Sequence, residues 1–155
     1  MINTENTWFL CAVILGLIVV FVPLVHFVKV KYQSRKPLFI DEMDGLEFEK
    51  FCAQLLEKKG FLDVNITRAS GDFGVDILAE KEGVTYAIQC KRYADPVGVK
   101  AIQEVYAGRE YYDRMVGAVL TNQYFTAPAV EAAKKLKILL WDRGYLERMM
   151  EESED

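Results

Sequence analysis

Three polar residues near the middle of the chain have the types and spacing of a site for a divalent cation and a phosphate. Asp76 begins one apolar stretch, and Gln89 and Lys91 occupy alternate positions of the next. Residues i and i+2 of a strand project to the same side, so Gln89 and Lys91 share a face and Cys90 turns away. Carboxylate and amide oxygens suit Mg²⁺. The expected chemistry is metal-assisted hydrolysis of a phosphodiester, with Lys91 orienting the attacking water or neutralising charge on the phosphate.

Strands must position these residues, and helices must cover the resulting sheet. The predicted strands cover residues 63–67, 75–80, 84–91, 116–121 and 138–141. The predicted helices cover residues 44–59, 97–112, 127–136 and 142–150. The short turn at Gly83 requires antiparallel neighbours, whereas strand-helix-strand connections favour parallel ones. The pattern predicts an α/β fold in which a mixed β-sheet is flanked by helices.

Three segments in this order resemble the catalytic domain of Mrr-like restriction endonucleases, a branch of the PD-(D/E)XK nucleases. They are Gly45-Leu46-Glu47-Phe48-Glu49, then Gly71-Asp72 with Gly74-Val75-Asp76, then Gln89-Cys90-Lys91. The resemblance runs from about Asp44 to Trp141, and three ordered motifs are more specific than one. It implies a restriction-endonuclease-like core (αβββαβ plus a C-terminal αβ) that cleaves DNA with Mg²⁺, for which Mn²⁺ can substitute.

The resemblance assigns roles residue by residue. Asp76 matches the metal-binding aspartate, Gln89 the middle residue of the Q-x-K form, and Lys91 the catalytic lysine. Glu49 matches the glutamate on the preceding helix and is a candidate metal ligand with Asp76 and Gln89. The chain departs from the wider superfamily at Val75, where proline is usual, and at Gln89, where an acidic residue is usual. Because glutamine brings no charge, Glu49 gains importance as a second carboxylate.

Two of the acidic residues, Glu49 and Asp72, also have a simpler interpretation in which they take no part in a site. Glu49 lies at the edge of an apolar helical arc, where a surface charge paired with Lys50 or Lys58 is the competing interpretation. Asp72 is a weaker site candidate, since aspartate in a glycine-rich segment commonly holds a turn.

The charge of the chain bears on DNA binding. Residues 1–40 contribute +3 to the net charge of −4, which leaves −7 beyond Ile40. DNA-binding domains are more often basic, so weak intrinsic affinity for DNA follows. Arg92, Lys100 and Arg109 are the candidates for contacts along the phosphate path. No helix-turn-helix or other reader of bases is recognisable in the sequence.

An apolar run over residues 8–28 contains no Lys, Arg, Asp or Glu. About twenty helical residues span a bilayer core, so the run predicts a transmembrane helix preceding the domain. It lacks the basic start and small-residue cleavage site of a signal peptide. Basic residues crowd its C-terminal flank, whereas Glu5 is the only charge before it. These flanks predict an inner-membrane protein with its N-terminus outside and its nuclease domain in the cytoplasm.

The expected organisation has five parts. They are a short extracytoplasmic N-terminus (1–7), a transmembrane helix (8–28), a basic juxtamembrane linker (29–40), an endonuclease domain (41–150) and an acidic tail (151–155). The expected partners are DNA and the lipid bilayer, and a homodimer or a membrane-associated partner protein is left open. Anchoring would hold the enzyme where foreign DNA enters, so the expected role is restriction or defence.

Several classes of site are excluded or disfavoured. His26 is the only histidine, so the domain beyond the apolar run cannot use histidine as a base or a zinc ligand. Cys11, Cys52 and Cys90 lack the paired spacing of a zinc site or disulfide framework. Two other functions stay open: a catalytically silent DNA-binding or scaffold module, against which the intact Asp76, Gln89 and Lys91 argue, and a branched-DNA resolvase.

Overall fold

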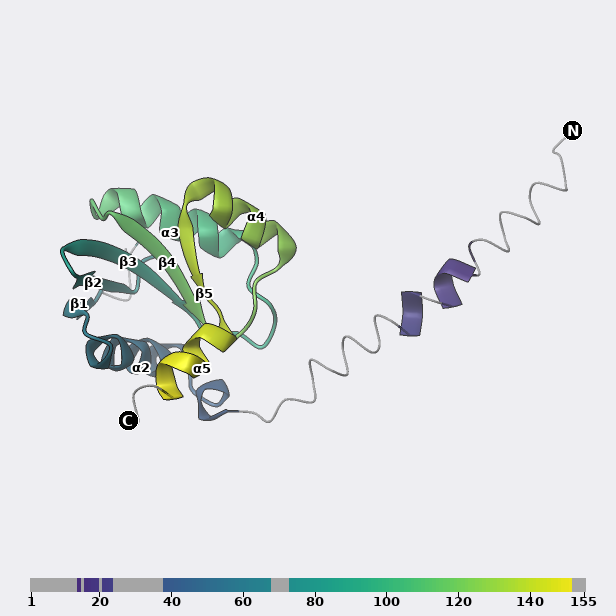
Figure 1. The fold of residues 1–155 in the computed structure, drawn as a ribbon, viewed down its shortest axis with the longest axis horizontal. Helices are drawn as coiled ribbons and strands as arrows, with labels where there is room; N and C mark the ends of the chain where they lie inside the picture. Colours follow the sequence, from purple (N-terminus) through teal and green to yellow (C-terminus); the bar gives the residue numbers. More distant parts are fainter. Residues whose placement is uncertain (1–13, 15, 20, 24–37, 68–72, 152–155) are drawn as a thin grey trace, which may run out of the picture. The chain divides into compact units, whose positions relative to one another are not determined.

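The computed structural model describes residues 38–67 and 73–151, together with residues 14, 16–19 and 21–23. The chain divides into two units, Met1–Pro37 and Leu38–Asp155. The described residues of the first unit are helical. The second unit holds the sheet and the helices that cover it (Figure 1). Residues 152–155 of the predicted acidic tail lie outside the described residues.

The expected fold class is corrected in one respect, which is the predicted transmembrane helix. Most of residues 8–28 lie outside the described part of the chain, as do residues 1–7 and the linker up to residue 37. Among the residues that the structure does describe, no helix combines the length and the apolar character needed to cross a membrane. The prediction rested on hydropathy, whereas a span needs about twenty continuous helical residues. The anchor and the inner-membrane localisation with the N-terminus outside are therefore not supported.

The second unit contains a mixed five-stranded sheet. Its strands are β1 (Leu62–Ile66), β2 (Ile77–Lys81), β3 (Val84–Lys91), β4 (Val116–Thr121) and β5 (Ile138–Trp141). They lie in the order β1-β2-β3-β4-β5. The pairs β1–β2 and β2–β3 are antiparallel, whereas the pairs β3–β4 and β4–β5 are parallel. The mixed sheet expected from the sequence is present, with antiparallel and parallel pairs where they were predicted.

Helices cover both faces of this sheet. They are the 3-10 turn η1 (Phe39–Asp41) and the α-helices α2 (Gly45–Lys58), α3 (Val99–Tyr111), α4 (Ala127–Leu136) and α5 (Arg143–Glu151). In Figure 1, α3 and α4 lie on one side of the sheet, and α2 and α5 lie on the other. Two apolar clusters fill the two interfaces: Phe48, Ile88 and Cys90 belong to the α2 side, whereas Ile102 and Val119 belong to the α3 side.

Local sequence signals account for the ends of the first elements. Asp44 caps α2 by accepting a hydrogen bond from the N–H of Glu47 at 2.8 Å. Gly60 follows the helix with φ of +78°, a conformation that glycine adopts without strain. Glu82 and Gly83 both have positive φ, as a two-residue hairpin turn requires. The hairpin of β2 and β3 then brings the start of one strand beside the end of the other.

Candidate active site

Asp76 immediately precedes β2 and lies beside the end of β3. Its N–H donates to the carbonyl of Ile88 at 2.9 Å, and its carboxylate Oδ2 accepts from the N–H of Cys90 at 2.6 Å. These two bonds flank Gln89 in the sequence of β3. The half-buried carboxylate of Asp76 is therefore held against the strand that carries Gln89 and Lys91.

Gln89 has a buried side chain in which one of the two polar atoms of the amide is hydrogen-bonded and the other is not. The residue is 1 % exposed. Its Nε2 donates to Oε2 of Glu104 at 3.0 Å. Its Oε1 is buried and has no hydrogen-bond partner. A buried acceptor without a partner is costly, so this oxygen is the atom that a bound cation or ordered water would satisfy.

Glu104 on α3 joins the two residues of the Q-x-K pair. Its Oε2 lies 3.4 Å from Nζ of Lys91, and its Oε1 lies 3.5 Å from Nζ of Lys100. Burial raises the pKa of Glu104, but the hydrogen bond from Gln89 and the positive charges of Lys91 and Lys100 outweigh it and keep the pKa below its ordinary value. Glu104 is thus an anion at neutral pH. It was not among the residues predicted from the sequence.

Gln89 and Lys91 both face α3, as the alternation of β3 predicted, and Cys90 packs on the opposite face. The Cys90 thiol is buried. A hydrogen bond with Cys52, burial, and the negative charges of Asp76 and Glu49 all raise its pKa. A protonated, buried thiol is a poor nucleophile. Cys90 is therefore a core residue.

Glu49 lies on α2, on the face of the sheet opposite to Glu104. Its side chain is half-buried, and its charge acts on the same Cys90 thiol as that of Asp76. The two carboxylates thus approach the end of β3 from α2 and from the start of β2. Asp72, the weaker candidate, lies outside the described residues.

The three predicted DNA-binding residues have different surroundings. Lys100 has a side chain that is 86 % exposed, beside Glu104. Arg92 donates from Nη2 to the carbonyl of Asp41 at 2.6 Å. Arg109 is 14 % exposed and pairs with Glu110 at 2.6 Å. It also packs against Gly117, near the start of β4, whereas Lys91 pairs with the last residue of β4. Of the three, Lys100 is the one that is both exposed and near Gln89 and Lys91.

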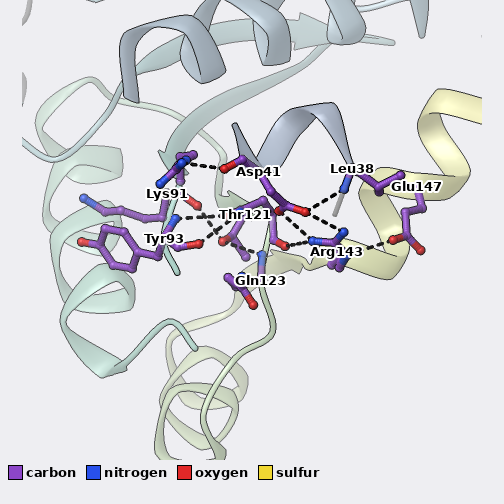
Figure 2. Close-up of polar contacts among 10 residues, drawn as sticks. Leu38, Asp41, Lys91, Tyr93, Thr121, Gln123, Arg143 and Glu147 are labelled. Atoms are coloured by element: carbon purple, nitrogen blue, oxygen red, sulfur yellow. Dashed lines mark hydrogen bonds and ion pairs between the residues drawn. The ribbon is translucent and has the colours of Figure 1, made fainter. Parts of the chain in front are cut away.

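An ion pair between the half-buried Asp41 and the buried Arg143 supports the chain just beyond Lys91. Asp41 accepts two hydrogen bonds from Arg143, at 2.8 and 2.9 Å, and a third from Asn122 at 2.9 Å. Asn122 also bonds both backbone groups of Tyr93. Figure 2 shows Asp41 and Arg143 facing each other beside Lys91 and Tyr93. The network ties η1, α5 and the end of β3 together.

The residues at this end of the sheet fit a weakly held Mg²⁺ ion. Among the described residues, no three His, Cys, Asp or Glu side chains converge as a metal cluster. Mg²⁺, however, is usually bound by one or two carboxylates together with water and substrate phosphate. The carboxylate of Asp76 and the unpartnered Oε1 of Gln89 supply oxygen ligands of the right kind. This donor set is consistent with an ion whose remaining coordination positions are filled by water or by substrate phosphate.

Residues 40–150 match the Mrr_cat family model, which is described as "Restriction endonuclease". No match was found among curated protein sequences. A crystal structure of the protein of unknown function AF1548 is similar, with 24 % identity and a TM-score of 0.58 over 67 % of this chain and 64 % of that one. The DNA modification-dependent restriction endonuclease AspBHI is 18 % identical with a TM-score of 0.52, over 70 % of this chain and 31 % of its own.

The restriction endonuclease MspJI, solved in complex with a 27-mer oligonucleotide, is 17 % identical with a TM-score of 0.46 over 82 % of this chain and 30 % of its own. The chain thus spans less than two thirds of each of these three proteins. At these identities the first two likenesses concern the fold. They agree with the mixed α/β core found here.

Proposed function

The chain belongs to the Mrr_cat family of restriction endonucleases, and because its matched region is an endodeoxyribonuclease domain, we propose that it hydrolyses phosphodiester bonds of DNA with Mg²⁺. The proposed site comprises Asp76, Gln89 and Lys91. Glu49 is proposed as a second carboxylate near the cation, approaching from α2.

One observation carries the assignment of the site. Gln89 Oε1 is buried without a hydrogen-bond partner, and the carboxylate of Asp76 is bonded to the next residue of the same strand. An orphaned acceptor is tolerated where a ligand satisfies it. The arrangement supports a cation held between these two side chains.

Each side chain has a distinct task in this proposal. When bound, Mg²⁺ supplies Lewis-acid activation of the phosphate and of water. Asp76 and Gln89 bind it through their oxygens. Lys91, whose Nζ lies 3.4 Å from Glu104, can stabilise negative charge developing on the phosphate. Lys100 contacts the DNA backbone beside them. The proposed biological role is restriction of, or defence against, foreign DNA.

The proposal is tested by incubating the full chain with supercoiled plasmid in Mg²⁺, Mn²⁺ or EDTA. Asp76→Asn and Lys91→Ala are run beside it, with Lys134→Ala on α4 as a surface control. The expected result is metal-dependent cutting that falls at least about 100-fold in both site variants and is unchanged in the control. Cutting that persists in EDTA, or in folded Asp76→Asn protein, would contradict the proposed site. If folded wild-type protein cuts neither plain, modified nor branched DNA, a silent scaffold becomes the better interpretation.

A further inference from the structure

Gln89 poses an orientation problem, because an amide presents an acceptor at one end and a donor at the other. A carboxylate at this position would bind a cation with either oxygen. An amide does so only when its oxygen points to the cation. Gln89 is nearly fully buried, so bulk water does not set its orientation.

We propose that Glu104 is the positioning residue that turns the Gln89 amide so that its oxygen faces the cation. This inference rests on the proposed function and deepens it. Glu104 Oε2 accepts from Gln89 Nε2 at 3.0 Å. The reverse orientation would set the amide oxygen against a carboxylate, two acceptors at hydrogen-bond distance without a proton between them. The Gln89 Oε1 is thereby directed away from Glu104.

The same carboxylate also places the second residue of the pair. Lys91 Nζ lies 3.4 Å from the oxygen that receives the Gln89 bond. One side chain on α3 therefore contacts both the amide of Gln89 and the amine of Lys91 near the end of β3. Removing a residue that hydrogen-bonds to a metal ligand commonly weakens metal binding by about 10- to 100-fold.

The backbone around Glu104 holds it in this position. Gly74 approaches Glu104 so closely that it has no room for a side chain. The helix is fixed further along by Gly108, which meets the carbonyl oxygen of Phe73 in the same way. The loop that leads to Asp76 and the helix that carries Glu104 are thus packed backbone to backbone.

A double-mutant cycle on the full chain tests whether Glu104 acts through Gln89. Mn²⁺ binding is measured by the electron paramagnetic resonance signal of the free ion, without DNA. The variants are Glu104→Ala, Gln89→Met and the double variant, with Glu110→Ala as the control. Glu110 lies on the same helix and carries the same charge, but it pairs with Arg109. Methionine keeps the volume of Gln89 and removes its amide. Thermal unfolding checks that each variant is folded.

Glu104→Ala is expected to weaken Mn²⁺ binding about 10-fold or more, and Glu110→Ala to leave it unchanged. Gln89→Met weakens it as well, and adding Glu104→Ala to Gln89→Met has no further effect. Equal affinity of wild type and Glu104→Ala would overturn the inference and leave the proposed function standing. The same fold-loss in both backgrounds would also overturn it, since Glu104 would then act as a ligand or by charge alone. Absence of Mn²⁺ binding by wild type would overturn both.

Discussion

Gly74 and Glu104 approach so closely that a Cβ built on Gly74 would lie 2.7 Å from the Cβ of Glu104. Real side chains do not tolerate such a distance, and Gly74 has φ of +74°, which also favours glycine. The contact joins the loop before Asp76 to the helix whose carboxylate bonds Gln89.

Gly74→Ala is expected to separate this loop from α3 and to move Asp76 relative to Gln89. Gly83→Ala is a matched control, because Gly83 has φ of +76° but open space around it. Both variants lose about 1–2 kcal/mol of folding free energy to the backbone strain. Plasmid cleavage should fall at least about 10-fold further in Gly74→Ala, since small displacements of reacting groups are costly. Equal cleavage by the two variants would show that the contact does not position the site.

Lys100 and Arg109 are expected to differ in DNA binding although both lie on α3. Lys100 is exposed beside the proposed site, whereas Arg109 is engaged with Glu110 and the carbonyl of Leu136. Lys100→Ala should weaken binding of a DNA duplex and reduce the salt dependence of log K by about 1, as expected for a lost phosphate contact. Arg109→Ala should leave both quantities unchanged. Fluorescence anisotropy across a salt series in Ca²⁺ measures the affinity and its salt dependence. A larger effect of Arg109→Ala than of Lys100→Ala would contradict the proposed DNA contact at Lys100.

Asp41→Asn is expected to destabilise the domain by about 3 kcal/mol at pH 7, because the buried Arg143 loses the carboxylate that accepts two of its hydrogen bonds. Burial raises the pKa of Asp41, but hydrogen bonds from Arg143 and Asn122 outweigh it and lower the pKa below 3.8. A lowered pKa means that the stabilisation is complete above this value and is lost as the pH falls through the folded-state pKa. The difference in unfolding free energy between wild type and Asp41→Asn should therefore narrow below about pH 4.

Glu147→Gln provides the comparison for Asp41→Asn on the same arginine. Glu147 is 37 % exposed and 3.0 Å from Arg143, so its loss should cost less than about 1 kcal/mol. Urea unfolding between pH 3 and 7 measures the unfolding free energy of wild type, Asp41→Asn and Glu147→Gln. Asp41→Asn and Glu147→Gln should not lose equal amounts of unfolding free energy, and equal losses would contradict the role given to Asp41. A difference between wild type and Asp41→Asn that widens in acid would contradict it as well.

Cys90→Ala is expected to retain metal-dependent cleavage within about threefold, because the thiol faces the core and is held protonated. The loss of packed volume should cost about 1 kcal/mol in unfolding free energy. Loss of cleavage in a variant that is folded by circular dichroism would show that the thiol takes part in the reaction.

Much of the fold could be predicted because its signals are local. Asp44 and Gly60 mark the ends of α2, and the turn at Gly83 fixes the hairpin of β2 and β3. The period of two in β3 placed Gln89 and Lys91 on one face and Cys90 on the other. An apolar run, by contrast, predicts a transmembrane helix only through its hydropathy. No described helix has the length and apolar character that a span needs.

The contacts that complete the site depend on packing between distant segments. Glu104 was missed because its role depends on how α3 sits on β3, which the close contacts at Gly74 and Gly108 determine. A signal was available: a helix that connects two parallel strands must pack on the sheet, and Lys100 and Glu104 are spaced i, i+4. Asp41 and Arg143 are 102 positions apart, and Phe39 and Ile40, the first two residues of η1, fell within the predicted linker. No local pattern joins them.

Whether Asp76 and Gln89 hold a divalent cation is tested most directly by crystals of the protein soaked in Mn²⁺, through the anomalous signal of the ion. The expected result is a peak within about 2.4 Å of both Gln89 Oε1 and an oxygen of Asp76, with Gln89 Nε2 still bonded to Glu104. A peak elsewhere, or a fully occupied ion that leaves Gln89 Oε1 without contact, would contradict the proposed site.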